Sequence, residues 1–155
     1  MATKHHNSNH LFLDTLPSAK GLRFALVVSR WNTEITESLF EGAHNILSQK
    51  HAHQIDRIDV PGSFELVYAS RKAMEKGYDA VIAIGSVIRG ETSHFDYVCQ
   101  GVTTGIQQLN AMGKTPVIFC VLTDDNLKQS QDRSGGALGN KGEEAAAAAI
   151  QMAKL

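Results

Sequence analysis

The run from Ala80 to Gly85 constrains the fold more than any other part of the chain. It reads Ala-Val-Ile-Ala-Ile-Gly and contains no polar side chain. Strands that are buried on both faces of a parallel sheet have this almost uniformly apolar character, whereas half-solvated strands alternate apolar and polar residues. The segment therefore predicts a strand in a parallel sheet with both of its faces covered.

Strand and helix patterns alternate along the rest of the chain. Runs of β-forming residues predict strands at 22–29, 58–60, 80–85 and 116–122. Apolar spacing and helix-end signals predict helices at about 34–50, 64–77, 93–112 and 125–131, and from about 140 onward, with a loop at 86–92. Right-handed crossovers would join these units into one sheet. We expect an α/β fold, a flavodoxin-like three-layer α/β/α sandwich with a four-stranded parallel sheet.

Composition excludes several classes of function. The 15 Lys and Arg residues balance 16 Asp and Glu residues, so no nucleic-acid partner or anionic membrane surface is indicated. No apolar stretch approaches the roughly 18 residues of a membrane span, and the polar N-terminal residues lack the apolar core of a signal peptide. Cys99 and Cys120 form no CxxC pair. We expect free thiols, no metal site and a soluble, cytoplasmic protein.

Chemically unusual residues follow each predicted strand. They lie in the segments 30–32, 61–65, 87–94 and 123–126. Ligands of open α/β sheets bind outside the carboxyl ends of the strands. One shared site at this edge of the sheet is therefore expected.

Two regions are candidates for binding phosphate. Residues 90–93, Gly-Glu-Thr-Ser, join a buried strand to a helix, where free backbone amides favour an anion. Neither a GxxxxGK[ST] nor a GxGxxG loop is present, and a simple helix cap at Thr92 or Ser93 is the alternative. Arg133 and Lys141 flank a glycine-rich turn, and a guanidinium group can clamp phosphate through two hydrogen bonds. The alternative for both is a solvated surface charge.

Three further side chains are candidates for binding or catalysis. His94 follows the phosphate loop, where it could transfer protons near neutral pH or simply begin a helix. Trp31, the only tryptophan, could stack on a flat heterocycle or act as a hydrophobic lid. Glu65 could accept hydrogen bonds from a polyol, or could interact with the dipole of a helix start.

Four segments together resemble the signature segments of the lumazine synthase family. They are Val60–Glu65, Gly85–Asp96, Phe119–Thr123 and Asn140–Gly142. The resemblance covers 21–155, which it identifies as a lumazine synthase domain, and leaves 1–20 as a flexible N-terminal extension. Because the four segments occur in the family's order and spacing, the combination is far more specific than any one of them.

The resemblance implies a role for each matching residue. Those implied to bind the pyrimidine and its ribityl chain are Trp31, Ser63, Phe64, Glu65, Ser86, Val87, Ile88 and Phe119. Those implied to bind phosphate are Glu91, Thr92, Arg133 and Lys141. His94 would transfer protons, and Phe119 would reach the site from a neighbouring subunit.

The family reaction condenses 5-amino-6-(D-ribitylamino)uracil with 3,4-dihydroxy-2-butanone 4-phosphate, giving 6,7-dimethyl-8-ribityllumazine, phosphate and water. The resemblance implies no cofactor. It implies small-molecule substrates, a homo-oligomeric pentamer assembled into a 60-mer shell, and riboflavin synthase as a partner. The alternatives are a flavin- or lumazine-binding shell with little turnover and, less favoured, a flavodoxin-like FMN carrier.

The chain departs from the family pattern at three positions. Trp31 stands where phenylalanine is commoner, which affects the expected flavin affinity rather than the reaction. Cys120 occupies a position that is usually glycine, and Asp124 one that is frequently threonine. Neither change removes a proposed catalytic group.

Overall fold

The computed structural model of the protein describes residues 15–155. Its main sheet contains β1 (Arg23–Ser29), β2 (Gln54–Val60), β3 (Ala80–Ile88) and β4 (Val117–Asp124). The helices are α2 (Thr33–Gln49), α3 (Leu66–Met74), α4 (His94–Met112), α5 (Leu127–Arg133) and α6 (Lys141–Met152). Two short strands, β5 (Ser134–Gly136) and β6 (Gly139–Asn140), form a separate antiparallel pair.

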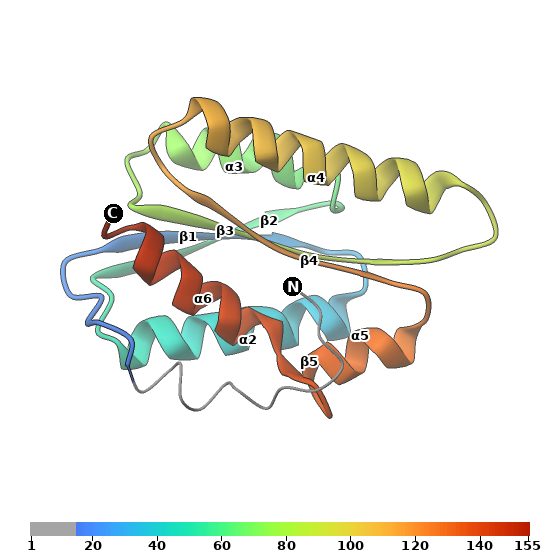
Figure 1. The fold of residues 1–155 in the computed structure, drawn as a ribbon, viewed down its shortest axis with the longest axis horizontal. Coiled ribbons are helices and arrows are strands. Elements are labelled where there is room, and N and C mark those ends of the chain that lie inside the picture. The colour runs from blue at the N-terminus through green and yellow to red at the C-terminus, as the bar shows by residue number, and fades with distance from the viewer. Residues whose placement is uncertain (1–14) are drawn as a thin grey trace.

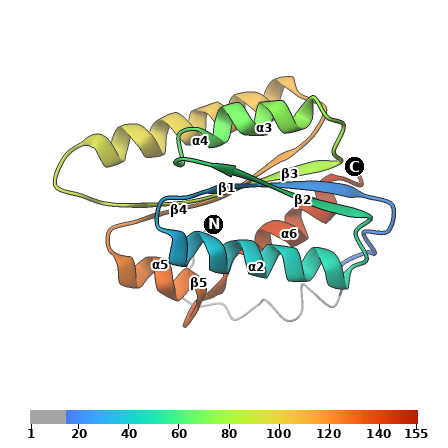
Figure 2. The same ribbon diagram turned by 180° about the vertical axis from the view of Figure 1, so that it is seen from behind.

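The sheet is parallel throughout and has the strand order β2-β1-β3-β4. Helices α3 and α4 cover one face, while α2, α5 and α6 cover the other (Figure 1). The view from behind shows the same three layers (Figure 2). The predicted three-layer α/β/α sandwich with a four-stranded parallel sheet is confirmed.

Alternating residues of the strands supply two hydrophobic cores, one on each face. On β1, Phe24, Leu26 and Val28 pack with the α2 and α6 side, whereas Ala25 and Val27 pack with the α3 side. Strand β3 is buried from Ala80 to Ser86. Burial of both faces therefore explains why the sequence of β3 lacks the alternation of a half-exposed strand.

Strand β3 continues three residues beyond its apolar run. Ser86, Val87 and Ile88 pair with β4, ending at the partners Ile88 and Asp124. The prediction that a loop begins at Ser86 is wrong, because β4 is long enough to extend the parallel ladder past Gly85. The phosphate-loop candidate therefore begins directly at the end of a paired strand.

The folded unit includes residues before position 21, where the sequence predicts its start. Leu16 and Ala19 are buried in the core formed with α2 and α6. The backbone amide of Ala19 donates to the carbonyl of Lys50. The rest of the predicted flexible extension, residues 1–14, lies outside the described residues.

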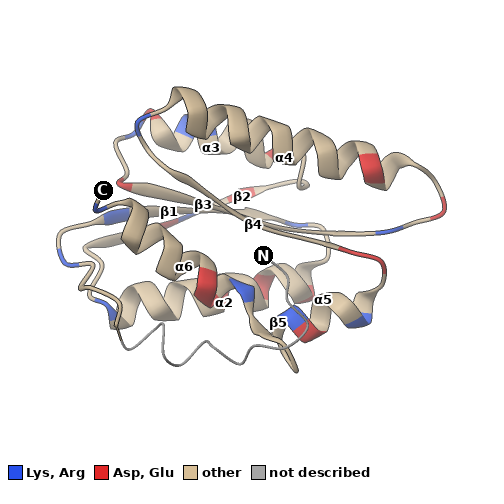
Figure 3. Cartoon of the chain, in the orientation of Figure 1, with Lys and Arg blue, Asp and Glu red and all other residues tan. Residues whose placement is uncertain are grey.

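Charged residues of both signs are interspersed over the described elements (Figure 3). This agrees with the near-zero formal charge of the sequence, −1 at pH 7. Among residues 15–155, no helix has the length and apolar character needed to cross a membrane.

Candidate active site

A cleft of about 620 Å³ opens at the carboxyl ends of β1, β2 and β3. Its walls combine three of the segments that the sequence singled out. The predicted site residues that line it are Trp31, Ser63, Phe64, Glu65, Ser86, Val87, Ile88 and His94. The structure therefore brings these residues together at the carboxyl edge of the sheet, where ligands of open α/β sheets bind.

The cleft also contains residues to which the sequence analysis gave no role. They are Asn32, Gly62, Tyr97 and Val98. Tyr97 and Val98 lie three and four positions after His94 on α4, so helical spacing places them on the same face as His94. That periodicity, applied from His94 onward, would have identified both.

The loop that carries Trp31 is fixed by its neighbour Asn32. Asn32 has a left-handed backbone conformation, with φ 54° and ψ 52°, which asparagine tolerates better than most residues. Its side-chain amide donates to the carbonyl oxygen of Ser86 at 2.9 Å. Trp31, whose exposed fraction is 71%, is thereby held at the mouth of the cleft, next to the end of β3.

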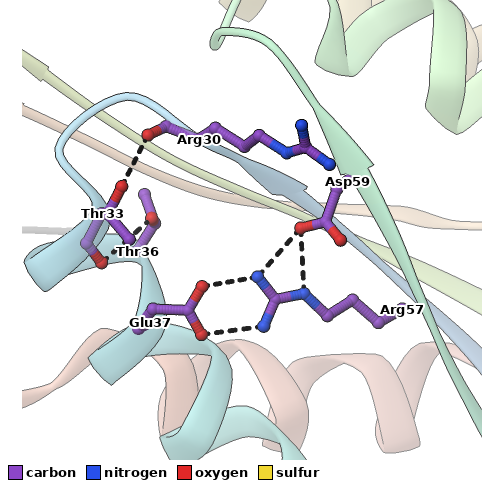
Figure 4. A network of polar contacts seen from close by, with 6 residues as sticks. All are labelled: Arg30, Thr33, Thr36, Glu37, Arg57 and Asp59. Carbon is purple, nitrogen blue, oxygen red and sulfur yellow. Dashed lines mark hydrogen bonds and ion pairs between the residues drawn. The ribbon is translucent and has the colours of Figure 1, made fainter.

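A polar network anchors the other side of the same loop (Figure 4). Arg57 on β2 forms hydrogen bonds to both carboxylate oxygens of Glu37 on α2, at 2.5 and 2.8 Å, and also to Asp59. The Glu37 contact is the main reason why the pKa of Arg57 is raised. The hydroxyl of Thr33 donates to the carbonyl of Arg30 at 2.8 Å. The Arg57 contacts therefore link α2 to the edge strand β2, and the Thr33 contact closes the loop between β1 and α2.

Two serine hydroxyls in the cleft wall are buried without a hydrogen-bond partner among the described residues. They belong to Ser63 and Ser86. A Cβ atom at Gly85 would lie 2.7 Å from the Ser63 hydroxyl oxygen, so glycine is needed for this close packing. The hydroxyl oxygens of both residues are enclosed by protein, so these small side chains pack the wall of the cleft.

His94 is the first residue of α4 and lines the cleft. Its backbone amide donates to the Thr92 hydroxyl oxygen at 3.4 Å, so Thr92 makes part of the cap contact that was its alternative role. Thr92 and Glu91 are exposed, and a Cβ atom at Gly90 would meet nothing within 4 Å. The loop before His94 is thus open to a ligand.

Arg89 holds this loop at its base. Its guanidinium group bonds to Asp125 at 2.9 Å and to Asp96 at 3.1 Å, and lies 4.1 Å from the centroid of the Phe95 ring. The Asp125 hydrogen bond is the largest cause of the raised pKa of Arg89. These contacts join the end of β3 to the first turn of α4 and to the segment after β4.

Five predicted site residues are not among those that line the cleft. Glu91 and Thr92 belong to the loop just before His94, whereas the other three lie on β4, α5 and α6. Phe119, 41% exposed, lies on the edge strand β4 and borders a different hollow of about 710 Å³. Arg133 ends α5 and donates to the carbonyl of Gln129. Lys141 pairs with Glu144 at 2.7 Å. In a single chain, the cleft is therefore not lined by Phe119, Arg133 or Lys141.

Within residues 15–155, no group of three or more His, Cys, Asp or Glu side chains is placed to hold a metal ion. Both cysteines are free. Burial raises the pKa of the Cys120 thiol to about 12. Because the thiolate is the reactive form of cysteine, this residue is suited to packing rather than to chemistry.

The fold and the cleft define a flavodoxin-like α/β protein with a cleft at the carboxyl edge of its parallel sheet. The family model of 6,7-dimethyl-8-ribityllumazine synthase matches residues 21–155. The chain belongs to this family, whose members are transferases of riboflavin biosynthesis.

Individual relatives support the same family along the whole chain. The 6,7-dimethyl-8-ribityllumazine synthase of Flavobacterium johnsoniae is 56% identical, over 100% of this chain and 83% of the relative. The enzyme of the same name from Christiangramia forsetii is 54% identical, over 100% and 95%. The one from Porphyromonas gingivalis is 50% identical, over 100% and 98%.

Proposed function

We propose that this chain condenses 5-amino-6-(D-ribitylamino)uracil with 3,4-dihydroxy-2-butanone 4-phosphate to give 6,7-dimethyl-8-ribityllumazine, phosphate and water. The main support is the single cleft that collects Trp31, the Ser63–Glu65 segment, the end of β3 and His94. These residues offer a stacking surface, groups for a polyol, backbone groups for a heterocycle and a proton carrier.

The proposed reaction needs positioning and proton transfer more than reactive side chains. An amine adds to the ketone, and water leaves to form an imine. Elimination of phosphate then leaves a new carbonyl group, to which the second amine adds, closing the ring with loss of a second water. Protons move at nearly every step, which suits a histidine at the cleft wall. Holding two reactants in the correct orientation can lower the activation barrier of a bimolecular reaction by several kcal/mol.

The proposed pyrimidine subsite uses the inner part of the cleft. Trp31 would stack on the heterocycle, and the backbone from Ser86 to Ile88 would bind its polar edge. Ser63, Phe64 and Glu65 would hold the ribityl chain. The position of all these residues around one cleft supports this assignment.

The proposed phosphate subsite combines the open loop with cations from elsewhere. The backbone amides of Glu91 and Thr92 would donate to the phosphate of the ketone substrate. Arg133 would clamp the same phosphate, with Lys141 nearby. Because Arg133 and Phe119 are not in the cleft of their own chain, we assign both to the site of a neighbouring subunit.

We further propose a pentameric ring, whose head-to-tail contacts close on themselves, packed into a sixty-subunit shell. The separation of the two half-sites within one chain supports the ring. The turn between Arg133 and Lys141 spans only a short strand pair, which leaves the packing of rings unobstructed. We also propose that riboflavin synthase is a partner of this protein and that the protein is cytoplasmic.

The direct test of the activity is incubation of the purified protein with both substrates. Lumazine absorbance should increase well above the spontaneous background reaction. The alternative function, a flavin- or lumazine-binding shell, predicts ligand binding with no increase over that background. Family membership and the position of His94 in the cleft favour the enzyme.

Binding of riboflavin or the lumazine product should quench the fluorescence of Trp31. Stacking brings the ligand ring into contact with the only indole of the chain. A fluorescence titration of the intact protein measures the effect, and Trp31→Phe provides the control without indole emission. Unchanged emission from a protein saturated with ligand would place Trp31 outside the stacking position.

Replacing Arg133 with alanine should raise the KM for the ketone phosphate roughly tenfold or more, because a charge-assisted hydrogen bond to phosphate is lost. The KM for the pyrimidine should change little. Steady-state kinetics with each substrate varied in turn separate the two constants. Lys128→Ala, which removes an exposed cation from the same helix, is the matched control. An equal rise in both KM values would contradict the phosphate role.

A further inference from the structure

Asp124 is a buried carboxylate beside the proposed phosphate clamp. It ends β4 and is only 7% exposed. One carboxylate oxygen, Oδ2, accepts a hydrogen bond from the Ser130 hydroxyl at 2.8 Å. The other, Oδ1, lies 3.7 Å from Nη1 of Arg133. The carboxylate is therefore held in place by α5, and its second oxygen is directed to the guanidinium group.

The side chain of Arg133 is itself mostly buried, with 26% of its surface exposed. Its Nη1 atom donates to the carbonyl of Gln129 at 2.9 Å. Gln129 and Asp124 thus both engage Nη1. Within residues 15–155, no hydrogen bond or ion pair involves Nε or Nη2 of Arg133, and this pair forms the edge with which arginine binds a phosphate through two hydrogen bonds.

This geometry separates two effects on Arg133. Orientation comes chiefly from the Gln129 carbonyl, since the Asp124 distance exceeds that of a hydrogen bond. Asp124 instead supplies a negative charge next to a positive one. Because both side chains are largely buried, solvent and salt screen this interaction less than they screen an exposed pair.

We propose that Asp124 is a built-in counter-ion of Arg133 that sets how tightly the site binds phosphate. This inference rests on the proposed role of Arg133. A neighbouring carboxylate partly neutralises the guanidinium group, so a bound phosphate gains less than it would from an unpaired cation. Both the substrate phosphate and the released phosphate are affected, and weaker binding favours release of the latter.

The test is Asp124→Asn, which removes the charge and keeps an oxygen that can accept from Ser130. Inorganic phosphate, used as a competitive inhibitor against the ketone phosphate, should bind about three- to tenfold more tightly, the range expected for one partly exposed charge. The KM for the ketone phosphate should decrease in parallel, while the KM for the pyrimidine stays constant. An unchanged or weaker phosphate affinity would overturn the proposal.

Two controls distinguish this effect from general charge changes and from loss of structure. Asp132→Asn removes a carboxylate from α5, the helix that carries Arg133, where it pairs with Lys128. This change should leave phosphate affinity nearly unchanged. Asp124→Thr, shorter and uncharged, should tighten phosphate binding as Asp124→Asn does. If Asp124→Asn fails to fold, the threonine variant decides the question, with native mass and thermal unfolding as checks on assembly.

A double-mutant cycle distinguishes failure of this inference from failure of the proposed function. In an Arg133→Ala background, Asp124→Asn should no longer tighten phosphate binding, because the cation on which it acts is absent. If Arg133→Ala alone leaves the KM for the ketone phosphate unchanged, the proposal that Arg133 binds phosphate is wrong. If it raises that KM and Asp124→Asn has no effect, only the counter-ion role is wrong.

Discussion

Replacing His94 with alanine is expected to lower kcat by roughly 10²- to 10⁴-fold, the usual contribution of a general acid–base catalyst. His94 is the histidine that lines the cleft, at the first position of α4. Because the reaction depends on proton transfers, their rates should decrease when the imidazole is lost. Activity should remain measurable, because Trp31, Glu65 and the end of β3 still orient the substrates.

Steady-state kinetics with both substrates near saturation measure this change. The KM values should shift much less than kcat, since the remaining cleft residues still bind the substrates. His44→Ala is the matched control, because His44 lies on α2 and stacks on Phe40, away from the cleft. A kcat for His94→Ala equal to that of the control would remove His94 from the mechanism.

The sequence predicted the architecture well where apolar residues mark buried segments. The apolar run from Ala80 identified a doubly covered parallel strand, and β3 is that strand. The pattern failed at Ser86, because its small polar side chain resembles that of a loop residue. Pairing with β4 extends the strand to Ile88. The register between two strands is a long-range property that local composition does not report.

The candidate site was predictable in part for a related reason. Residues that follow parallel strands meet at one edge of the sheet, so Trp31, Ser63 and His94 could be expected together. The role of Asn32 was not predictable, because it depends on a left-handed backbone and on a carbonyl of a distant strand. Nor did the sequence indicate that the carboxylate of Asp124 lies beside Arg133.

Phe119 and Arg133 show the limit of reasoning from one chain. The glycine-rich turn made Arg133 a phosphate candidate, but only the family resemblance grouped Arg133 and Phe119 with the cleft residues. In one chain, neither residue lines the cleft. Phe119 is a half-exposed aromatic side chain on the edge strand of the sheet. Its exposure is compatible with contact to another subunit, and the remaining question is whether each site needs two chains.

Co-assembly of two variants that are each weakly active should raise activity if the site is shared between subunits. His94→Ala chains keep an intact Arg133 half, and Arg133→Ala chains keep an intact His94 half. Each proposed site takes its His94 half from one chain and its Arg133 half from the next chain in the ring. When the two variants are mixed equally, each half is intact in about half of the cases, so about one quarter of the sites have both halves intact. Activity should therefore reach about a quarter of that of the unsubstituted protein, above either parent, at ketone phosphate concentrations well below KM.

The experiment requires both variants to be expressed in one cell with distinguishable masses, so that native mass spectrometry can confirm mixed rings. The matched control mixes each variant with a chain carrying both substitutions, which restores no complete site in any arrangement. Activity in the first mixture and not in the controls assigns His94 and Arg133 to different chains of one site. If mixed rings form and activity stays at the level of the parents, each site lies within a single chain, and the shared-site proposal for Arg133 is wrong.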